Sequence, residues 1–99
     1  MLYLEAPAGV GYSYCVDPES TCTSNDTSTA ADNHEFLVGF MHAFPEYKAR
    51  PMFITGESYA GVYIPTLMQE ITKHGVIANV VGVAIGNGCC KSTRALAMY

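Results

Sequence analysis

Residues 51–61 read Pro-Met-Phe-Ile-Thr-Gly-Glu-Ser-Tyr-Ala-Gly. The continuous apolar run Met52–Ile54 predicts a buried strand, because a strand covered on both faces carries apolar side chains at successive positions. A helix is expected to follow over about residues 58–73, and Gly75 suits its C-terminal cap. Ser58 therefore lies in a sharp strand-to-helix turn of small residues, and the rest of the chain is organised around that junction.

Two further apolar segments and a second helix surround this junction. Residues 1–6 form a short apolar run that Pro7 ends, and residues 79–85 form another. Over residues 29–44, apolar side chains recur at i, i+3, i+4 and i+7, which predicts an amphipathic helix beginning at Thr29. The order strand, helix, strand, helix, strand implies parallel strands joined by right-handed crossovers. The sequence therefore predicts an α/β class core with parallel strands.

Length and composition limit the classes of function. The 99 residues allow at most one domain, and 49% apolar with only 14% charged residues is typical of the interior of a larger protein. The net charge is −4 and the basic residues are scattered, so no nucleic-acid partner is expected. No apolar run approaches the roughly 20 residues that span a bilayer, so no membrane partner is expected. Met1 opens no leader pattern, which argues against an intact secreted protein.

No cofactor or metal is expected either. The glycines at 9 and 11 lack the third glycine of a dinucleotide-binding fingerprint. The cysteines lack the Cys-x-x-Cys spacing of zinc sites, and no pair of histidines accompanies them. The four cysteines are Cys15, Cys22, Cys89 and Cys90.

The polar loop over residues 15–29 indicates the cellular compartment of the protein. Cys15 and Cys22 flank it and either form a disulfide across it or remain reduced as small apolar side chains. Asn25-Asp26-Thr27 is an N-glycosylation sequon in the same loop. A sequon beside a possible disulfide favours an oxidising compartment and hence the secretory pathway.

The junction at Ser58 carries the chemistry. A serine in a strand–turn–helix junction flanked by small residues is typical of the nucleophile of α/β-hydrolases, and Ala60 stands where glycine is usual. The residue after the nucleophile, here Tyr59, offers its backbone N–H at the helix N-terminus to an oxyanion. The alternative is that Ser58 is an ordinary helix N-cap serine.

The wider sequence resembles the serine carboxypeptidase family, which includes cathepsin A and the vacuolar carboxypeptidases. Residues 54–65, Ile-Thr-Gly-Glu-Ser-Tyr-Ala-Gly-Val-Tyr-Ile-Pro, are similar to its serine-site signature. Residues 4–14, Leu-Glu-Ala-Pro-Ala-Gly-Val-Gly-Tyr-Ser-Tyr, look like a second hallmark. Residues 44–47 and 84–88 are further similarities at the expected spacing, and the resemblance covers residues 2–90.

This resemblance implies that residues 1–99 are part of an α/β-hydrolase domain truncated at both ends. It implies that Ser58 attacks the last peptide bond of a peptide or protein and forms an acyl-enzyme. It also implies that Glu57 helps to hold the substrate's terminal carboxylate. Two carboxyl groups share a hydrogen bond only when one is protonated, which fits an acidic lysosome or vacuole. The alternative for Glu57 is an acid favoured by the helix dipole.

The residues that would complete a catalytic triad are not in this chain. The fold class supplies an aspartate and then a histidine after the nucleophile, but only Glu70 and His74 follow Ser58. His74 lies roughly 24 Å along the helix axis and cannot reach the serine. We therefore expect the isolated chain to be inactive.

Two other functions remain open at this stage. One is an acyltransferase of the same superfamily, in which a small-molecule hydroxyl replaces water. Those relatives often carry aspartate before the serine, so Glu57 favours the peptidase. The other is a non-enzymatic, truncated product that keeps the serine turn without the triad.

Overall fold

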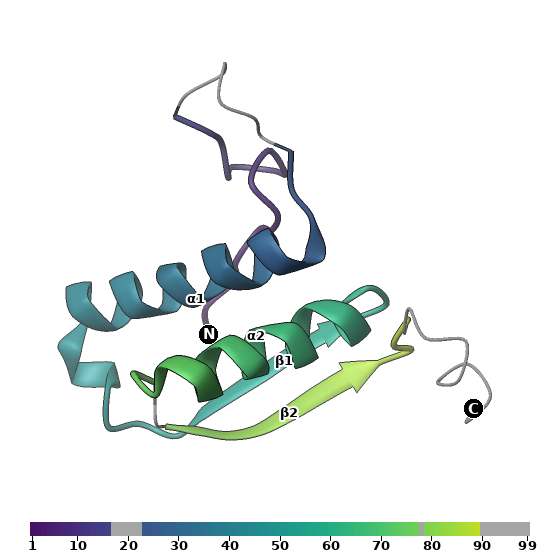
Figure 1. The fold of residues 1–99 in the computed structure, drawn as a ribbon. Helices are drawn as coiled ribbons and strands as arrows, with labels where there is room; N and C mark the ends of the chain where they lie inside the picture. The colour runs from purple at the N-terminus through teal and green to yellow at the C-terminus, as the bar shows by residue number, and fades with distance from the viewer. Residues whose placement is uncertain (17–22, 78, 90–99) are drawn as a thin grey trace.

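The computed structural model describes residues 1–16, 23–77 and 79–89. Within these residues, two α-helices and a two-stranded parallel sheet form the fold, with α2 packed on the sheet and α1 packed on α2 (Figure 1). The fold therefore belongs to the α/β class, as predicted. The elements in chain order are α1 (Asp26–Ala43), the 3-10 turn η1 (Pro45–Tyr47), β1 (Met52–Glu57), α2 (Ala60–His74) and β2 (Val80–Gly86).

The predicted strand–turn–helix junction is present. β1 and β2 pair in parallel register from Phe53 opposite Gly82 to Glu57 opposite Gly86. α2 ends at Gly75, which adopts the left-handed conformation with φ 67° and donates its backbone N–H to the Ile71 carbonyl. Glycine reaches this conformation without a steric penalty, so the predicted C-cap is confirmed.

Helix α1 begins earlier than the predicted Thr29. Asn25 is its N-cap, and its Oδ1 accepts a hydrogen bond from the Ser28 backbone N–H at 2.9 Å. Ser28 Oγ accepts in return from the Asn25 backbone N–H at 2.9 Å. Asparagine is among the best N-cap residues, and this reciprocal pair satisfies two donors at once. Thr29 is consequently buried inside the helix.

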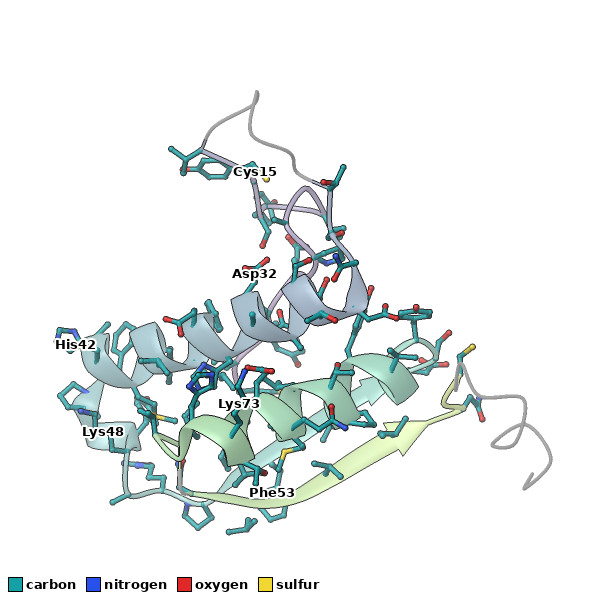
Figure 2. All side chains as sticks on the ribbon, in the orientation of Figure 1. Cys15, Asp32, His42, Lys48, Phe53 and Lys73 are labelled. Atoms are coloured by element: carbon teal, nitrogen blue, oxygen red, sulfur yellow. The ribbon has the colours of Figure 1, made fainter. Side chains whose placement is uncertain are left out.

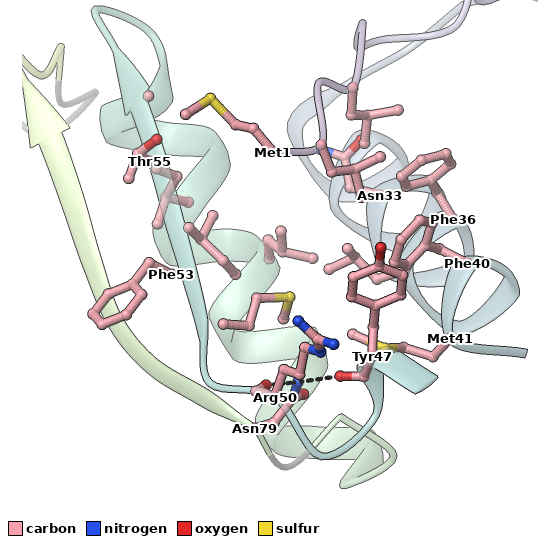
Figure 3. A pocket seen from close by; sticks show the side chains of 18 of the residues that line it. Met1, Asn33, Phe36, Phe40, Met41, Tyr47, Arg50, Phe53, Thr55 and Asn79 are labelled. Atoms are coloured by element: carbon pink, nitrogen blue, oxygen red, sulfur yellow. Dashed lines mark hydrogen bonds between the residues drawn. The ribbon is translucent and has the colours of Figure 1, made fainter. Parts of the chain in front are cut away.

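The prediction of a strand at residues 1–6 is wrong. Residues 1–6 carry no strand pairing. They line one side of a cavity of about 790 Å³, whose other walls include β1 and α1. Figure 3 shows Phe36, Phe40 and Met41 of α1 along this cavity. A strand forms only when a neighbouring backbone lies within hydrogen-bonding distance, and the cavity separates residues 1–6 from β1.

The core joins the two helices to the segment before β2. The side chains of Leu37, Leu67, Ile71 and Ile77 form one buried cluster. Met52 and Ile54 of β1 pack against it from the sheet. Burying apolar area in this cluster stabilises the arrangement that holds β1 and α2 together at Ser58.

The two strands leave large apolar side chains exposed. Phe53 is 69% exposed, and the others on β2 are Val81, Val83 and Ile85. Exposed apolar strands promote association between chains. We expect the 99-residue chain expressed alone to aggregate or to bind a hydrophobic dye, as light scattering and dye fluorescence would detect.

A matched pair of variants tests this explanation. Phe53→Lys places a charge on an exposed strand position and should lower the scattering. Ile54→Lys, at the neighbouring position that packs against the buried cluster, should raise it. A soluble monomer of the unaltered chain with a sharp, cooperative thermal transition would contradict the prediction.

Candidate active site

Ser58 lies in the turn between β1 and α2 with φ 58°. This left-handed conformation is uncommon for a residue other than glycine and costs on the order of 1–3 kcal/mol. The same conformation occurs close by at Asn87, with φ 45°, directly after β2. Left-handed backbone at a serine between a strand and a helix is the geometry of a nucleophile turn, in which the hydroxyl is presented at the end of the sheet.

Backbone hydrogen bonds hold Ser58 in that conformation. Its N–H donates to the Gly86 carbonyl at 2.9 Å, which extends the pairing of β1 with β2. Its carbonyl accepts from the N–H of Gly61 at 3.0 Å and from the N–H of Cys89 at 2.7 Å. The turn is therefore fixed both by the first turn of α2 and by the segment that follows β2.

Small residues make this close approach possible. A Cβ added to Gly56 would lie 2.5 Å from the Ala60 Cβ, so these two positions face one another across the turn. A Cβ added to Gly61 would lie 2.6 Å from the Cys89 carbonyl oxygen. The alanine at position 60 is accommodated because position 56 is glycine.

Tyr59 is the N-cap residue of α2. Its backbone is therefore at the helix N-terminus, where N–H groups have no partner within the helix and the helix dipole is positive. The Tyr59 ring packs edge-on against Tyr63, with centroids 4.9 Å apart, and its hydroxyl donates to Asp26 Oδ1 at 2.9 Å. No local pattern predicts this contact, because Asp26 and Tyr59 are 33 positions apart.

Glu57 is the last residue of β1, directly before Ser58. It lies opposite Gly86 in the sheet register and is exposed. Among the described residues, its carboxylate makes no hydrogen bond or ion pair. The carboxylate is thus adjacent to the serine and accessible.

The histidines lie elsewhere. His34 is only 3% exposed and stacks on His74, with ring centroids 4.8 Å apart, and His74 Nε2 lies 3.2 Å from Glu70 Oε2. His34 is buried because its position on α1 faces α2. His74 ends the 15-residue α2, so roughly 22 Å of helix separate it from the turn. His42 is exposed in the last turn of α1.

Cys15 lies in the segment before α1, where Figure 2 labels it. Asn25 caps α1 through Oδ1, as described above. Cys15 is disulfide-bonded. Cys22, the partner considered from the sequence, and Cys90 lie outside the described residues, whereas Cys89 is a free, exposed thiol.

Ser58 is not among the residues that line the 790 Å³ cavity. Its lining, drawn in part from residues 1–6, α1, α2 and β1, is mostly apolar but includes the polar side chains of Asn33, Arg50 and Asn79. The cavity is partly open to solvent, since Met1, Phe44 and Phe53 in its lining are exposed. Within the described residues, no group of three metal-ligating side chains occurs. No helix of the described part is long and apolar enough to cross a membrane.

Comparison with known proteins places these features in a family. A sequence model described as serine carboxypeptidase matches residues 1–99. The lysosomal protective protein of Mus musculus is 49% identical over 88 residues, covering 89% of this chain and 18% of that protein. Serine carboxypeptidase-like 21 of Arabidopsis thaliana is 44% identical over 93 residues, covering 89% of this chain and 19% of that protein.

A third relative, serine carboxypeptidase 1 of Hordeum vulgare, is 44% identical over 96 residues, covering 91% of this chain and 19% of that protein. The chain thus spans about a fifth of the length of these curated relatives. The match extends over the whole chain, including the left-handed serine turn between β1 and α2. The chain belongs to the serine carboxypeptidase family and is part of its α/β-hydrolase fold.

Proposed function

We propose that this chain is the nucleophile-bearing part of a longer serine-type carboxypeptidase, called here the parent enzyme, which removes residues from the C-termini of peptides and proteins. The observation that carries the proposal is the left-handed φ of 58° at Ser58, between β1 and α2 of a chain that matches the family throughout. A strained serine turn of this kind persists only where surrounding contacts enforce it, which is typical of functional sites.

Ser58 Oγ attacks the carbonyl carbon of the last peptide bond, and its proton passes to a base. The tetrahedral oxyanion is stabilised by the backbone N–H of Tyr59 at the N-terminus of α2. Collapse expels the C-terminal amino acid, which takes up the proton, and leaves an ester on Oγ. Water then hydrolyses the ester and restores the serine.

The base and its supporting acid come from the parent enzyme outside residues 1–99. This part of the proposal rests on the positions of the chain's own histidines, since His74 lies at the far end of α2 and stacks on His34. The isolated chain is accordingly inactive. The location of the parent enzyme is the secretory pathway, in a lysosome or vacuole or outside the cell, and Asn25 is its glycosylation candidate.

Two measurements test the proposal directly. The first is the full transcript read through both ends of this segment, which should continue to an aspartate and then a histidine downstream. The second is labelling of the parent enzyme by a serine-reactive phosphonate, followed by mass analysis of the peptide that contains Ser58. A reading frame confined to residues 1–99, or a folded parent enzyme that is not labelled at Ser58, would overturn the proposal.

Glu57 provides a test of the exopeptidase assignment. Its exposed carboxylate directly precedes the nucleophile, which suits a contact with the free carboxyl group of a substrate. Glu57→Ala should lower kcat/KM for a blocked dipeptide acid roughly 20-fold, because it removes a hydrogen bond to a charged group. The corresponding dipeptide amide should be cleaved at an unchanged rate.

Glu57→Gln is the matched control for this prediction. The amide retains a hydrogen-bond donor of the same size, so the variant should keep a preference for the acid over the amide substrate. An equal loss of activity on both substrates in Glu57→Ala would contradict a role in carboxylate binding and would point to the helix-dipole alternative.

A further inference from the structure

A side-chain hydrogen bond connects the N-termini of the two helices. Tyr59 Oη donates to Asp26 Oδ1 at 2.9 Å, across 33 positions of sequence. Both helices begin on the same side of the molecule in Figure 1. Tyr59 is the N-cap of α2, and Asp26 is the first residue of α1.

Other contacts of Tyr59 lie within α2. Its carbonyl accepts from the N–H of Val62 at 2.9 Å and from the N–H of Tyr63 at 3.2 Å. Its ring packs against the Tyr63 ring. These contacts fix Tyr59 relative to its own helix, whereas the Asp26 contact fixes it relative to α1.

The Asp26 end of this bond is itself held firmly. The capping box formed by Asn25 and Ser28 fixes the first turn of α1, which contains Asp26. An acid in the first turn is favoured by the helix dipole, and an ionised carboxylate accepts a stronger hydrogen bond than a neutral group. The Tyr59 hydroxyl is therefore anchored to a rigid part of a second helix.

We propose that Asp26 is a positioning residue for the reaction: by holding the Tyr59 hydroxyl, it orients the backbone N–H that stabilises the oxyanion. This inference rests on the proposed function. The Tyr59 N–H directly follows the strained Ser58, so a small rotation of Tyr59 moves the oxyanion donor relative to the attacking hydroxyl. Donors in such sites act only when they point at the position of the developing charge.

The test compares kcat and KM in the parent enzyme with a blocked dipeptide substrate. Tyr59→Phe removes the hydroxyl but keeps the ring and the backbone N–H, and Asp26→Ala removes the acceptor. Each should lower kcat about tenfold, with KM within twofold of the unaltered enzyme, because the oxyanion contact forms only in the transition state. The double variant should be no slower than either single variant, since both remove the same bond.

Asp26→Asn is the conservative rescue. Its amide oxygen still accepts from the Tyr59 hydroxyl, so kcat should recover to within about threefold of the unaltered enzyme. Tyr63→Phe controls for loss of a tyrosine hydroxyl one turn further along α2, and should leave kcat unchanged. Thr27→Ala controls for loss of the glycan, because it destroys the sequon without altering Asp26, and should also leave kcat unchanged.

The outcomes separate this inference from the proposed function. An unaltered parent enzyme that fails to label at Ser58 overturns both. Full labelling and turnover, with an unchanged kcat in Tyr59→Phe, overturns the positioning role alone. A parallel fall in kcat and thermal midpoint, without rescue by Asp26→Asn, also overturns it, since that pattern indicates a purely structural bond.

Discussion

Replacing Ser58 by alanine is expected to lower kcat of the parent enzyme by a factor on the order of a million, to the level set by binding and the oxyanion donor alone. In the proposed mechanism the serine hydroxyl oxygen forms the covalent intermediate, so its removal abolishes that route. Hydrolysis of a blocked dipeptide and labelling by a serine-reactive phosphonate should both disappear. Ser24→Ala, at an exposed serine before α1, is the matched control and should retain both.

Ser58→Gly separates the strain at this position from its chemistry. Glycine adopts a φ of 58° without a steric penalty, so this variant should be as inactive as Ser58→Ala but more stable than it by about 1 kcal/mol. The free energy of unfolding measures the difference. Residual hydrolysis or labelling in either variant would show that another residue is the nucleophile.

Gly61→Ala is expected to destabilise the parent enzyme by about 2–3 kcal/mol and to lower kcat about 100-fold. The added Cβ would lie 2.6 Å from the carbonyl oxygen and 2.9 Å from the nitrogen of Cys89, both backbone atoms that cannot turn aside. The segment after β2 must therefore move. That movement breaks the hydrogen bond from the Cys89 N–H to the Ser58 carbonyl and releases the nucleophile turn.

Gly39→Ala is the matched control for this prediction. Gly39 lies exposed inside α1, and a Cβ added there meets no atom within 4 Å. Alanine favours a helix over glycine, so Gly39→Ala should stabilise the enzyme by about 0.5–1 kcal/mol and leave kcat unchanged. Thermal unfolding and kcat measured on both variants check the prediction. A Gly61→Ala enzyme with unchanged stability and kcat would show that the segment after β2 does not hold the turn.

The serine junction could be predicted because its signals are local. An apolar run, small residues around Ser58 and a glycine at position 75 together determine a strand, a sharp turn and a helix with a defined end. The structure agrees with each of these, and the family resemblance stated from residues 54–65 and 4–14 agrees with the match over the whole chain.

Two predictions are wrong, and they concern the strand at residues 1–6 and the start of α1. The apolar run at residues 1–6 has the composition of a strand, but a strand also needs a paired backbone, and a cavity separates this run from β1. The sequence predicts that α1 begins at Thr29, whereas its N-cap is the sequon residue Asn25. Asparagine at position 25 suits both a sequon and an N-cap. The hydrogen bonds that identify it as the N-cap depend on the backbone conformation.

The sequence by itself determined the family, the α/β class and the identity of the candidate nucleophile, because those depend on residue types at fixed local spacing. Only the tertiary structure decided that α1 and α2 are joined by the hydrogen bond between Tyr59 and Asp26. It also decided that the Cys89 backbone N–H donates to the Ser58 carbonyl. These contacts join residues about thirty positions apart, and no periodicity or spacing along the chain encodes the direction in which two helices bring their ends together.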